Sequence, residues 1–269
     1  MFGQIADVYR RTRKPKDILW NRFVARPLAA VLLVPLRATS VTPNQITLLT
    51  LIVFAGGAAL LALGAGWRNL VIAAAIIEVS YVLDCVDGQL ARLKGTSSPV
   101  GAHLDFLMDE LKAFLLIAAV GVRLWMATSD ARWLVEGLLG LVIVASAISL
   151  TTFLRRPEYA AATGARVAMG AGDYGAGFAG ADPAAAAGAP GAGPRLSPMR
   201  ALEALGKLIV HYPSYILFVA LANRIDLFLH AYVVMNAAYA ARSLLGIAVK
   251  LGRPIRAPGA TPTAGGPVT

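Results

Sequence analysis

The sequence predicts an all-α integral membrane protein with six transmembrane helices, preceded by an amphipathic interfacial helix near the N-terminus. Of its 269 residues, 57% are apolar and 15% are charged, whereas a soluble domain has about 25% charged residues. Apolar blocks of about 20 residues recur along almost the whole chain, and each could cross a hydrocarbon core about 30 Å thick. Lysine and arginine gather in alternate links between these blocks. These observations argue against a soluble globular fold.

The interfacial helix is predicted within residues 10–37, where basic side chains surround an apolar set. This pattern is typical of a helix that lies in the lipid headgroup region. The apolar run in residues 27–36 is about ten residues long, which is too short for a straight membrane crossing. Residues 1–13 lack the apolar core and cleavage site of a secretory signal. We therefore expect residues 1–43 to form a basic cytoplasmic segment.

Six membrane spans follow this segment. Each is an apolar block bounded by polar or turn-forming residues, and the fifth is short and contains Pro213. A proline is tolerated in a membrane helix where neighbouring groups satisfy the freed carbonyl. The predicted spans are Asn44–Ala65, Asn69–Leu93, Val100–Met126, Trp133–Phe153, Leu208–Ala222 and Leu227–Val249.

The basic residues predict the orientation of the chain. If the N-terminus is cytoplasmic, the cytoplasmic links receive 19 of the 25 lysine and arginine residues and the opposite links receive four. Because positive charge is enriched on the cytoplasmic side, both termini are predicted to be cytoplasmic. The excess of arginine (19) over lysine (6), with much alanine and glycine, suggests a GC-rich bacterial genome and hence the bacterial inner membrane.

Two segments do not fit a packed domain. The link at residues 157–198 is almost entirely alanine, glycine and proline, a composition that cannot bury enough apolar surface to offset chain entropy. We expect a disordered cytoplasmic loop there, interrupting a six-helix domain at residues 44–250, and a disordered tail at 251–269.

The net charge of +10 suits basic loops beside anionic lipid better than nucleic acid binding. The single cysteine, Cys85, cannot form an intrachain disulfide.

Four aspartates stand where a membrane protein rarely carries charge. Asp84 and Asp87 lie on one face of the second span, and Asp105 and Asp109 lie four residues apart on the third. The link between these spans is short, so the two helices are expected to be antiparallel neighbours whose carboxylates converge at the cytoplasmic end. Charged groups within membrane helices usually mark a functional site, because each is costly to insert.

Converging carboxylates require a compensating cation, since like charges repel. Hard oxygen ligands without histidine or cysteine favour Mg²⁺, Mn²⁺ or Ca²⁺, and magnesium in turn suggests a phosphate-containing substrate. Arg92 could clamp such a phosphate, and Gly88 and Gly101 would let a ligand approach the backbone. Close helix packing is the alternative for the two glycines, and an ion-pair network is the alternative for the aspartates.

These residues resemble the signature of the CDP-alcohol phosphotransferases, D-x2-D-G-x2-A-R-x(7 or 8)-G-x3-D-x3-D. The signature is complete here, with eight residues between Arg92 and Gly101, and Thr42, Pro43 and Asn44 are similar to a segment often seen before the first span. The matching residues are Asp84, Asp87, Gly88, Ala91, Arg92, Gly101, Asp105 and Asp109.

The resemblance implies transfer of a substituted phosphate from a CDP-linked alcohol to a second alcohol, with release of CMP. Asp84, Asp87 and Asp105 would hold the metal, while Asp109 would deprotonate the acceptor and also touch a second ion, so that two Mg²⁺ or Mn²⁺ ions are expected. Family members also form homodimers. The implied donor-binding residues are Gly88, Ala91, Arg92, Gly101 and Asn44.

Several basic residues could bind the acceptor, but each also has a structural explanation. Arg155 and Arg156 could be positive-inside anchors, Lys112 could pair with Glu78 or Glu110, and His211 could be an interhelical hydrogen-bonding residue. Arg242 lies within the last span and needs an anionic partner.

The reaction that the resemblance implies, and that we expect here, uses CDP-diacylglycerol as donor and a polar alcohol, such as inositol phosphate or glycerol phosphate, as acceptor. One alternative is the reverse polarity, with a CDP-linked polar alcohol as donor and a lipid or polyol as acceptor. A divalent-cation transporter is an alternative of another class, although Arg92 beside the acids would repel a permeating cation.

Overall fold

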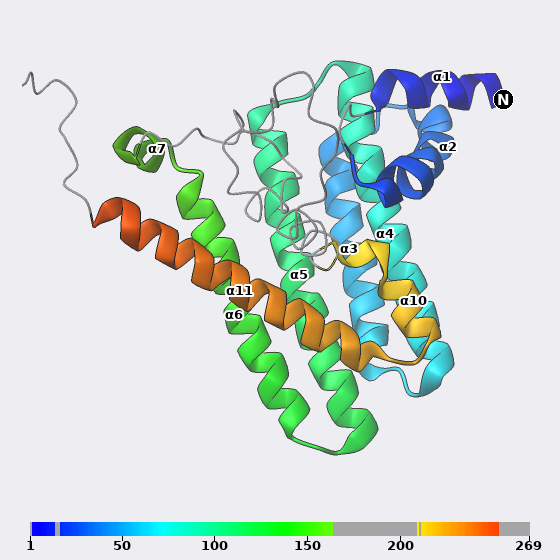
Figure 1. Cartoon of the computed structure of the whole chain (residues 1–269). Helices are drawn as coiled ribbons and strands as arrows, with labels where there is room; N and C mark the ends of the chain where they lie inside the picture. The colour runs from blue at the N-terminus through cyan, green and yellow to red at the C-terminus, as the bar shows by residue number, and fades with distance from the viewer. Residues whose placement is uncertain (1, 14–16, 164–208, 210, 253–269) are drawn as a thin grey trace, which may run out of the picture.

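The computed structural model describes residues 2–13, 17–163, 209 and 211–252 (Figure 1). The secondary structure of these residues is helical, with no strand among them. Five of the helices are long and apolar enough to cross a membrane, and they confirm five of the six predicted spans to within three residues at each end. These five helices are α3 (Pro43–Leu63), α4 (Gly66–Lys94), α5 (Pro99–Thr128), α6 (Arg132–Leu154) and α11 (Ile225–Leu251).

Local signals in the sequence fix where the helices begin and end. Thr42 and Gln45 form a capping box, in which each side chain accepts a hydrogen bond from the other residue's backbone N–H. Gly95 ends α4 in the left-handed conformation, at φ +66°, which glycine adopts without steric cost. The Ser98 side chain then caps α5 by accepting a hydrogen bond from Gly101 N at 3.0 Å.

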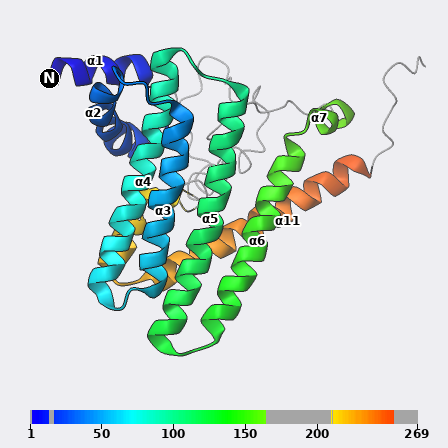
Figure 2. The ribbon, with the colours of Figure 1, turned by 180° about the vertical axis from the view of Figure 1, so that it is seen from behind.

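The short turn after Gly95 makes α4 and α5 antiparallel, but the two helices are not the close neighbours that the sequence predicts. Helix α3 packs closely against both of them, and neither packs as closely against the other. Figure 2 shows α3 beside α4 and α5 from behind. The ends of α4 and α5 nearest their connecting turn are therefore held apart by a third helix.

The other half of the bundle has an apolar core. A buried apolar cluster joins α3, α4, α5, α6 and α11, and α5 and α6 touch at two glycines. A Cβ atom on Gly121 would lie 3.0 Å from the Cα of Gly137. Arg123 closes this end by donating hydrogen bonds to the carbonyls of Leu61, Gly64 and Gly66 at 2.7–3.3 Å.

The N-terminal segment is two helices rather than the one predicted at residues 10–37. Helix α1 (Phe2–Thr12) is followed by a π-helical turn, η1 (Asn21–Ala25), which leads into α2 (Arg26–Leu36). The sequence places Pro15 between them, and proline disfavours helical conformation in the residue before it. Both helices pack against α4, and α1 lies across one end of the bundle in Figure 1.

The fifth predicted span differs most from the structure. Its described part is a 3₁₀ turn, η2 (Tyr212–Ser214), and a six-residue helix, α10 (Ile216–Leu221). The Trp67 indole donates to the carbonyls of Ala220 and Leu221, each at 3.1 Å, which ties α10 to the start of α4. Six helical residues rise about 9 Å, so this described segment is too short to cross a membrane.

The predicted disordered loop begins with ordered structure. Residues 157–163 form a short helix, α7 (Pro157–Thr163), whose first position suits proline because the missing N–H would have no helical partner there. The remainder of the predicted loop, 164–198, lies outside the described residues, as does the tail from residue 253.

Candidate metal and phosphate site

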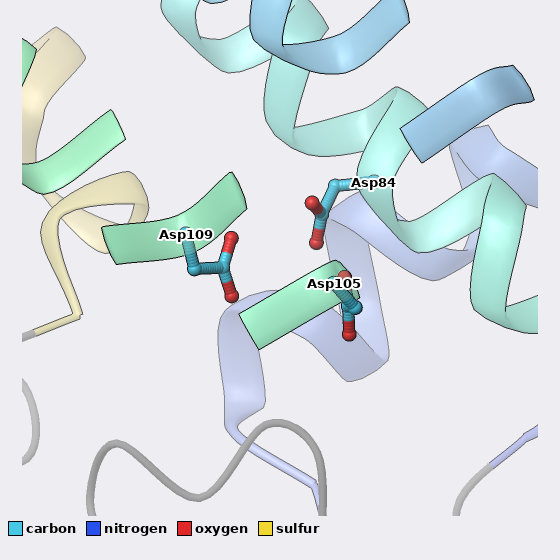
Figure 3. Close-up of side chains that lie close together, drawn as sticks. All are labelled: Asp84, Asp105 and Asp109. Carbon is cyan, nitrogen blue, oxygen red and sulfur yellow. The ribbon is translucent and has the colours of Figure 1, made fainter. Parts of the chain in front are cut away.

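Three of the four signature aspartates meet in the space between α4 and α5. Asp84 comes from α4, and Asp105 and Asp109 come from successive turns of α5 (Figure 3). Each offers one carboxylate oxygen, and these oxygens all lie within 4.8 Å of one another. All three residues are half-buried. A cation placed among them could reach ligands from two helices.

Asp87 lies on α4, like Asp84, but its side chain is hydrogen-bonded to α3. Its Oδ2 accepts a hydrogen bond from the hydroxyl of Thr47 at 2.6 Å, and the residue is buried. Asp87 does not belong to the three-carboxylate group. Thr47 therefore fixes one oxygen of Asp87, a contact that the sequence analysis missed. The available signal was the place of Thr47 one turn into α3, three residues after Asn44 of the Thr42–Pro43–Asn44 segment.

Lys112 joins two of the clustered aspartates. Its ammonium forms ion pairs with Asp84 and with Asp109 Oδ1, the latter at 3.2 Å, and its side chain is 2% exposed. The sequence analysis considered Glu78 and Glu110 as partners of Lys112. The structure instead directs Lys112 toward the carboxylate cluster, because Lys112 follows Asp109 by almost one turn of α5.

Arg92 lies above Gly88 on α4. A Cβ on Gly88 would meet the Arg92 Nη1 atom at 3.5 Å, so the guanidinium covers this glycine. The Nε atom donates to the carbonyl of Thr12 in α1 at 3.0 Å. The Nη2 atom is buried without a hydrogen-bond partner among the described residues. Because buried donors are normally paired, this group is available to an anionic ligand.

Gly101 brings the first turns of α3 and α5 together. A Cβ at this position would meet Ser98 Oγ at 3.2 Å and Asn44 Oδ1 at 3.4 Å. Neither Gly88 nor Gly101 touches the backbone of a neighbouring helix in the way that Gly121 does. Close packing against a neighbouring helix therefore does not explain Gly88, whereas Gly101 lies close to the Asn44 side chain of α3. Ala91 is half-buried one turn beyond Gly88.

The arginines predicted to bind the acceptor differ in their contacts and exposure. The Arg155 guanidinium lies 4.8 Å from the ring centre of Phe106, the residue that follows Asp105. Arg156 is exposed at the end of α6, and Arg242 is exposed on α11. Arg155 therefore contacts the residue that follows a clustered aspartate on α5.

His211 belongs to a hydrogen-bonded chain between segments. Its Nε2 lies 2.8 Å from the Tyr81 hydroxyl, and its Nδ1 lies 2.6 Å from Ser214 Oγ. The Tyr81 hydroxyl also donates to Asn21 Oδ1 at 2.6 Å. Both ring nitrogens of His211 thus have protein partners, as expected for an interhelical hydrogen-bonding residue.

The donor atoms of the cluster fit a hard divalent cation. All of them are carboxylate oxygens, and this chemistry favours Mg²⁺ or Mn²⁺ over zinc or copper. The partly buried setting also fits, since carboxylates repel one another strongly where the dielectric constant is low, and the one positive charge of Lys112 offsets only part of the three negative charges. The residues present can therefore bind a metal ion.

The fold and the site define a class: a helical integral membrane protein with a carboxylate site that can bind a metal. The profile of the CDP-alcohol phosphatidyltransferase family matches residues 40–177, just over half of the chain. The protein belongs to this family. The matched region includes every residue of the signature, and it runs from α3 to beyond α7.

Two relatives are named bifunctional IPC transferase and DIPP synthase. The protein from Rubrobacter xylanophilus is 34% identical over 84 residues, which make up 31% of this chain and 18% of the relative. The protein from Aquifex aeolicus is 26% identical over 103 residues, 38% of this chain and 23% of the relative. The similarity thus spans about a fifth of the length of these curated relatives.

Proposed function

We propose that this protein transfers a phosphatidyl group from CDP-diacylglycerol to a polar alcohol and releases CMP. The observation that carries this proposal is the three-carboxylate cluster of Asp84, Asp105 and Asp109. Family membership supports CDP-alcohol chemistry, and the relatives' names contain transferase and synthase activities. Residues 44–250 would form the catalytic domain, and residues 1–43 would lie at the membrane surface.

The signature aspartates would hold the metal. Asp84 and Asp105 contribute oxygens to the cluster, and Asp87 would supply the oxygen that Thr47 does not bind. A divalent ion bound there, which we propose to be Mg²⁺ with Mn²⁺ as a substitute, would neutralise negative charge on the diphosphate of the donor. The Thr47 hydrogen bond would keep Asp87 oriented before any ligand arrives.

Asp109 would act as the general base. It would accept the proton of the acceptor hydroxyl, so that the alcohol oxygen attacks the phosphorus atom as the bond to CMP breaks. Arg92 would hold a phosphate oxygen with its unpaired Nη2 group. The donor nucleotide would border Gly88, Ala91, Gly101 and Asn44, where small side chains leave room beside the backbone.

The acceptor site would lie on the α6 side of the cluster. Arg155 is the best-placed of the predicted residues, because it packs on the ring next to Asp105. Arg156 and Arg242 could add positive charge, which would favour a phosphorylated acceptor such as inositol phosphate or glycerol phosphate. His211 is less well placed because both of its nitrogens have protein partners.

The proposed setting is the bacterial inner membrane. With both termini cytoplasmic, the α4–α5 turn and the cluster below it would face the cytoplasm, where CDP-linked substrates and the lipid surface meet. The positive-inside distribution of lysine and arginine supports this orientation. Two copies of the chain would associate as a homodimer, as the family resemblance implies.

An acceptor screen tests this function. Purified protein in mixed micelles receives Mg²⁺ and CDP-diacylglycerol, and CMP release is measured with inositol phosphate, glycerol phosphate, serine or inositol. We expect one phosphorylated acceptor to stimulate CMP release. If every acceptor fails, while a CDP-linked polar alcohol yields CMP with a lipid or polyol acceptor, the donor polarity is reversed.

A further inference from the structure

Helix α1 lies outside the region that matches the family but contacts the signature. The matched region is residues 40–177, whereas α1 ends at Thr12. The backbone carbonyl of Thr12 nevertheless accepts a hydrogen bond from Arg92 Nε at 3.0 Å. Thr12 is 1% exposed, and carbonyls in the last turn of a helix have no partner within that helix. Arg92 therefore pairs with an acceptor from a segment that the family match does not include.

The contact with Thr12 fixes how the Arg92 guanidinium is turned. A guanidinium is planar, and its N–H groups point in fixed directions. Once Nε donates to the Thr12 carbonyl, the direction of Nη2 is set as well. Nη2 is the group that is buried without a partner among the described residues and that would hold the donor phosphate. The position of α1 therefore affects how Arg92 presents this group to the phosphate.

Few contacts hold α1 in its docked position. Two of its eleven residues, Val8 and Thr12, are buried, and Ile5 and Tyr9 pack against the same apolar cluster as Val8. A helix of this length is marginally stable by itself in water, and a segment with few buried contacts opens more readily than a core. A partner that binds docked α1 would therefore shift the population toward the docked position.

The exposed surface of α1 fits an anionic membrane surface. Its one acidic residue, Asp7, lies 3.8–3.9 Å from two arginines, and exposed ion pairs of this kind contribute little. Helix α1 lies crosswise at the end of the bundle in Figure 1, as a helix at the headgroup level would. Basic amphipathic helices bind anionic lipid. The exposed arginines at the C-terminal end of α1 and directly after it are Arg10, Arg11 and Arg13.

We propose that these three arginines bind anionic lipid headgroups, and that this binding holds Thr12 against Arg92 for donor binding. The proposal rests on the proposed function, from which it takes the phosphate-binding role of Arg92. The three arginines are positioning residues, because they act on the donor through Thr12 and Arg92. Phosphatidyl transfer is then coupled to the charge of the membrane surface on which α1 lies.

A spin label on α1 tests lipid binding without relying on turnover. Gly3 is exposed, and a Cβ atom there would meet nothing within 4 Å, so Gly3→Cys should be tolerated. The native Cys85 is buried and should not react with the label. The full-length protein is placed in nanodiscs of phosphatidylcholine, with or without phosphatidylserine. We expect electron paramagnetic resonance to show a mobile label in the neutral nanodiscs and an immobilised label in the anionic ones.

Titration with CDP tests the coupling to Arg92. The unlabelled protein in the same two kinds of nanodisc is titrated with CDP in the presence of Mg²⁺, and binding is measured by calorimetry. Because apparent affinity scales with the fraction of protein in the competent state, the Kd of CDP should be about three- to tenfold lower in anionic nanodiscs. Anionic lipid by itself would repel the anionic nucleotide, which would change the Kd in the opposite direction.

Two triple variants with the same loss of charge separate α1 from the rest of the surface. Arg10→Gln, Arg11→Gln and Arg13→Gln together should abolish the effect of phosphatidylserine on the label and on the Kd of CDP. The matched control changes three exposed arginines near the starts of α4, α6 and α11 and should retain both effects. Its substitutions are Arg68→Gln, Arg132→Gln and Arg224→Gln. Size-exclusion chromatography checks folding, and the wild-type comparison decides the question if a variant does not fold.

The possible outcomes separate this proposal from the proposed function. A label that is equally mobile in both kinds of nanodisc would overturn lipid binding by α1 and leave the function intact. A label that responds, while CDP binds equally well in both, would overturn the coupling to Arg92. Equal effects in the two triple variants would overturn the role of the α1 arginines. If CDP binds in neither kind of nanodisc and no CMP is released, the proposed function fails together with the coupling.

Discussion

The two halves of α5 show how one helix serves opposite purposes. In its first half, Asp105, Asp109 and Lys112 fill a space between α4 and α5 with charged side chains. In its second half, the helix is buried among apolar residues and meets α6 where Gly121 faces Gly137. A Cβ atom added to Gly121 would lie 3.0 Å from the Cα atom of Gly137. The helix is packed closely against α6 at one end and carries charged side chains at the other, where the proposed ligand would bind.

The two halves of α5 are expected to contribute differently to the stability of the protein. Charged residues within a membrane helix are costly unless they are paired, whereas small residues allow close van der Waals packing between helices. The glycine half is therefore expected to supply stability, and the aspartate half to carry function at the expense of stability. Substitutions in the two halves should separate these properties.

The largest effect is expected at the aspartate end. Asp84→Asn removes one charge from the cluster and leaves Lys112 without one of its two partners, so turnover should fall by at least about 10³-fold as metal and phosphate stabilisation is lost. CMP release and Mn²⁺ binding measure the effect. Asp130→Asn is the control, because Asp130 lies at the opposite end, where it pairs with Arg132 at 2.9 Å. Equal losses in the two variants would contradict the assignment of chemistry to one end.

A smaller effect on stability is expected at the glycine end. Gly121→Ala places a methyl group against the Gly137 backbone and should lower the free energy of unfolding by about 1–3 kcal/mol through overpacking. The midpoint of thermal unfolding in detergent should fall, with turnover at low temperature nearly unchanged.

Gly56→Ala is the matched substitution for Gly121→Ala. Gly56 is exposed on α3, and its Cβ would meet nothing within 4 Å, so this variant should be as stable as wild type or slightly more so. If the two glycine variants unfold at the same temperature, close packing at Gly121 does not stabilise the bundle.

The smallest effect is expected from a deletion in the link at residues 157–198. Deleting residues 170–193, in the alanine- and glycine-rich link, should leave turnover largely unchanged, because loop-closure free energy changes by only about 0.6 kcal/mol for each twofold change in length. CMP release by the purified deletion variant checks this. Loss of turnover in a well-folded variant would show that the link takes part in the reaction.

The sequence predicted the long helices well because their signals are local. The capping box at Thr42 and Gln45 and the turn glycine, Gly95, lie where α3 begins and α4 ends. The fifth span is not confirmed by its described part, since an apolar run around Pro213 does not distinguish a membrane crossing from a short turn and helix. The break before η1 was also missed.

The site was predictable in its residue types but not in its contacts. The signature singled out the aspartates, and the spacing placed them on helix faces. That Asp87 binds Thr47, and that Lys112 bridges Asp84 and Asp109, depends on α3 holding α4 and α5 apart. Such a three-helix arrangement is a tertiary property, which periodicity along one helix does not encode.

The most direct test of the central claim separates binding from chemistry at Asp109. Asp109→Asn keeps the size of the side chain but removes the proposed base, so CMP release with saturating Mg²⁺, donor and acceptor should fall by about 10²- to 10⁴-fold. Donor binding, measured by titration with CDP-diacylglycerol in the same micelles, should remain close to that of wild type. Turnover that persists in this variant would contradict the account.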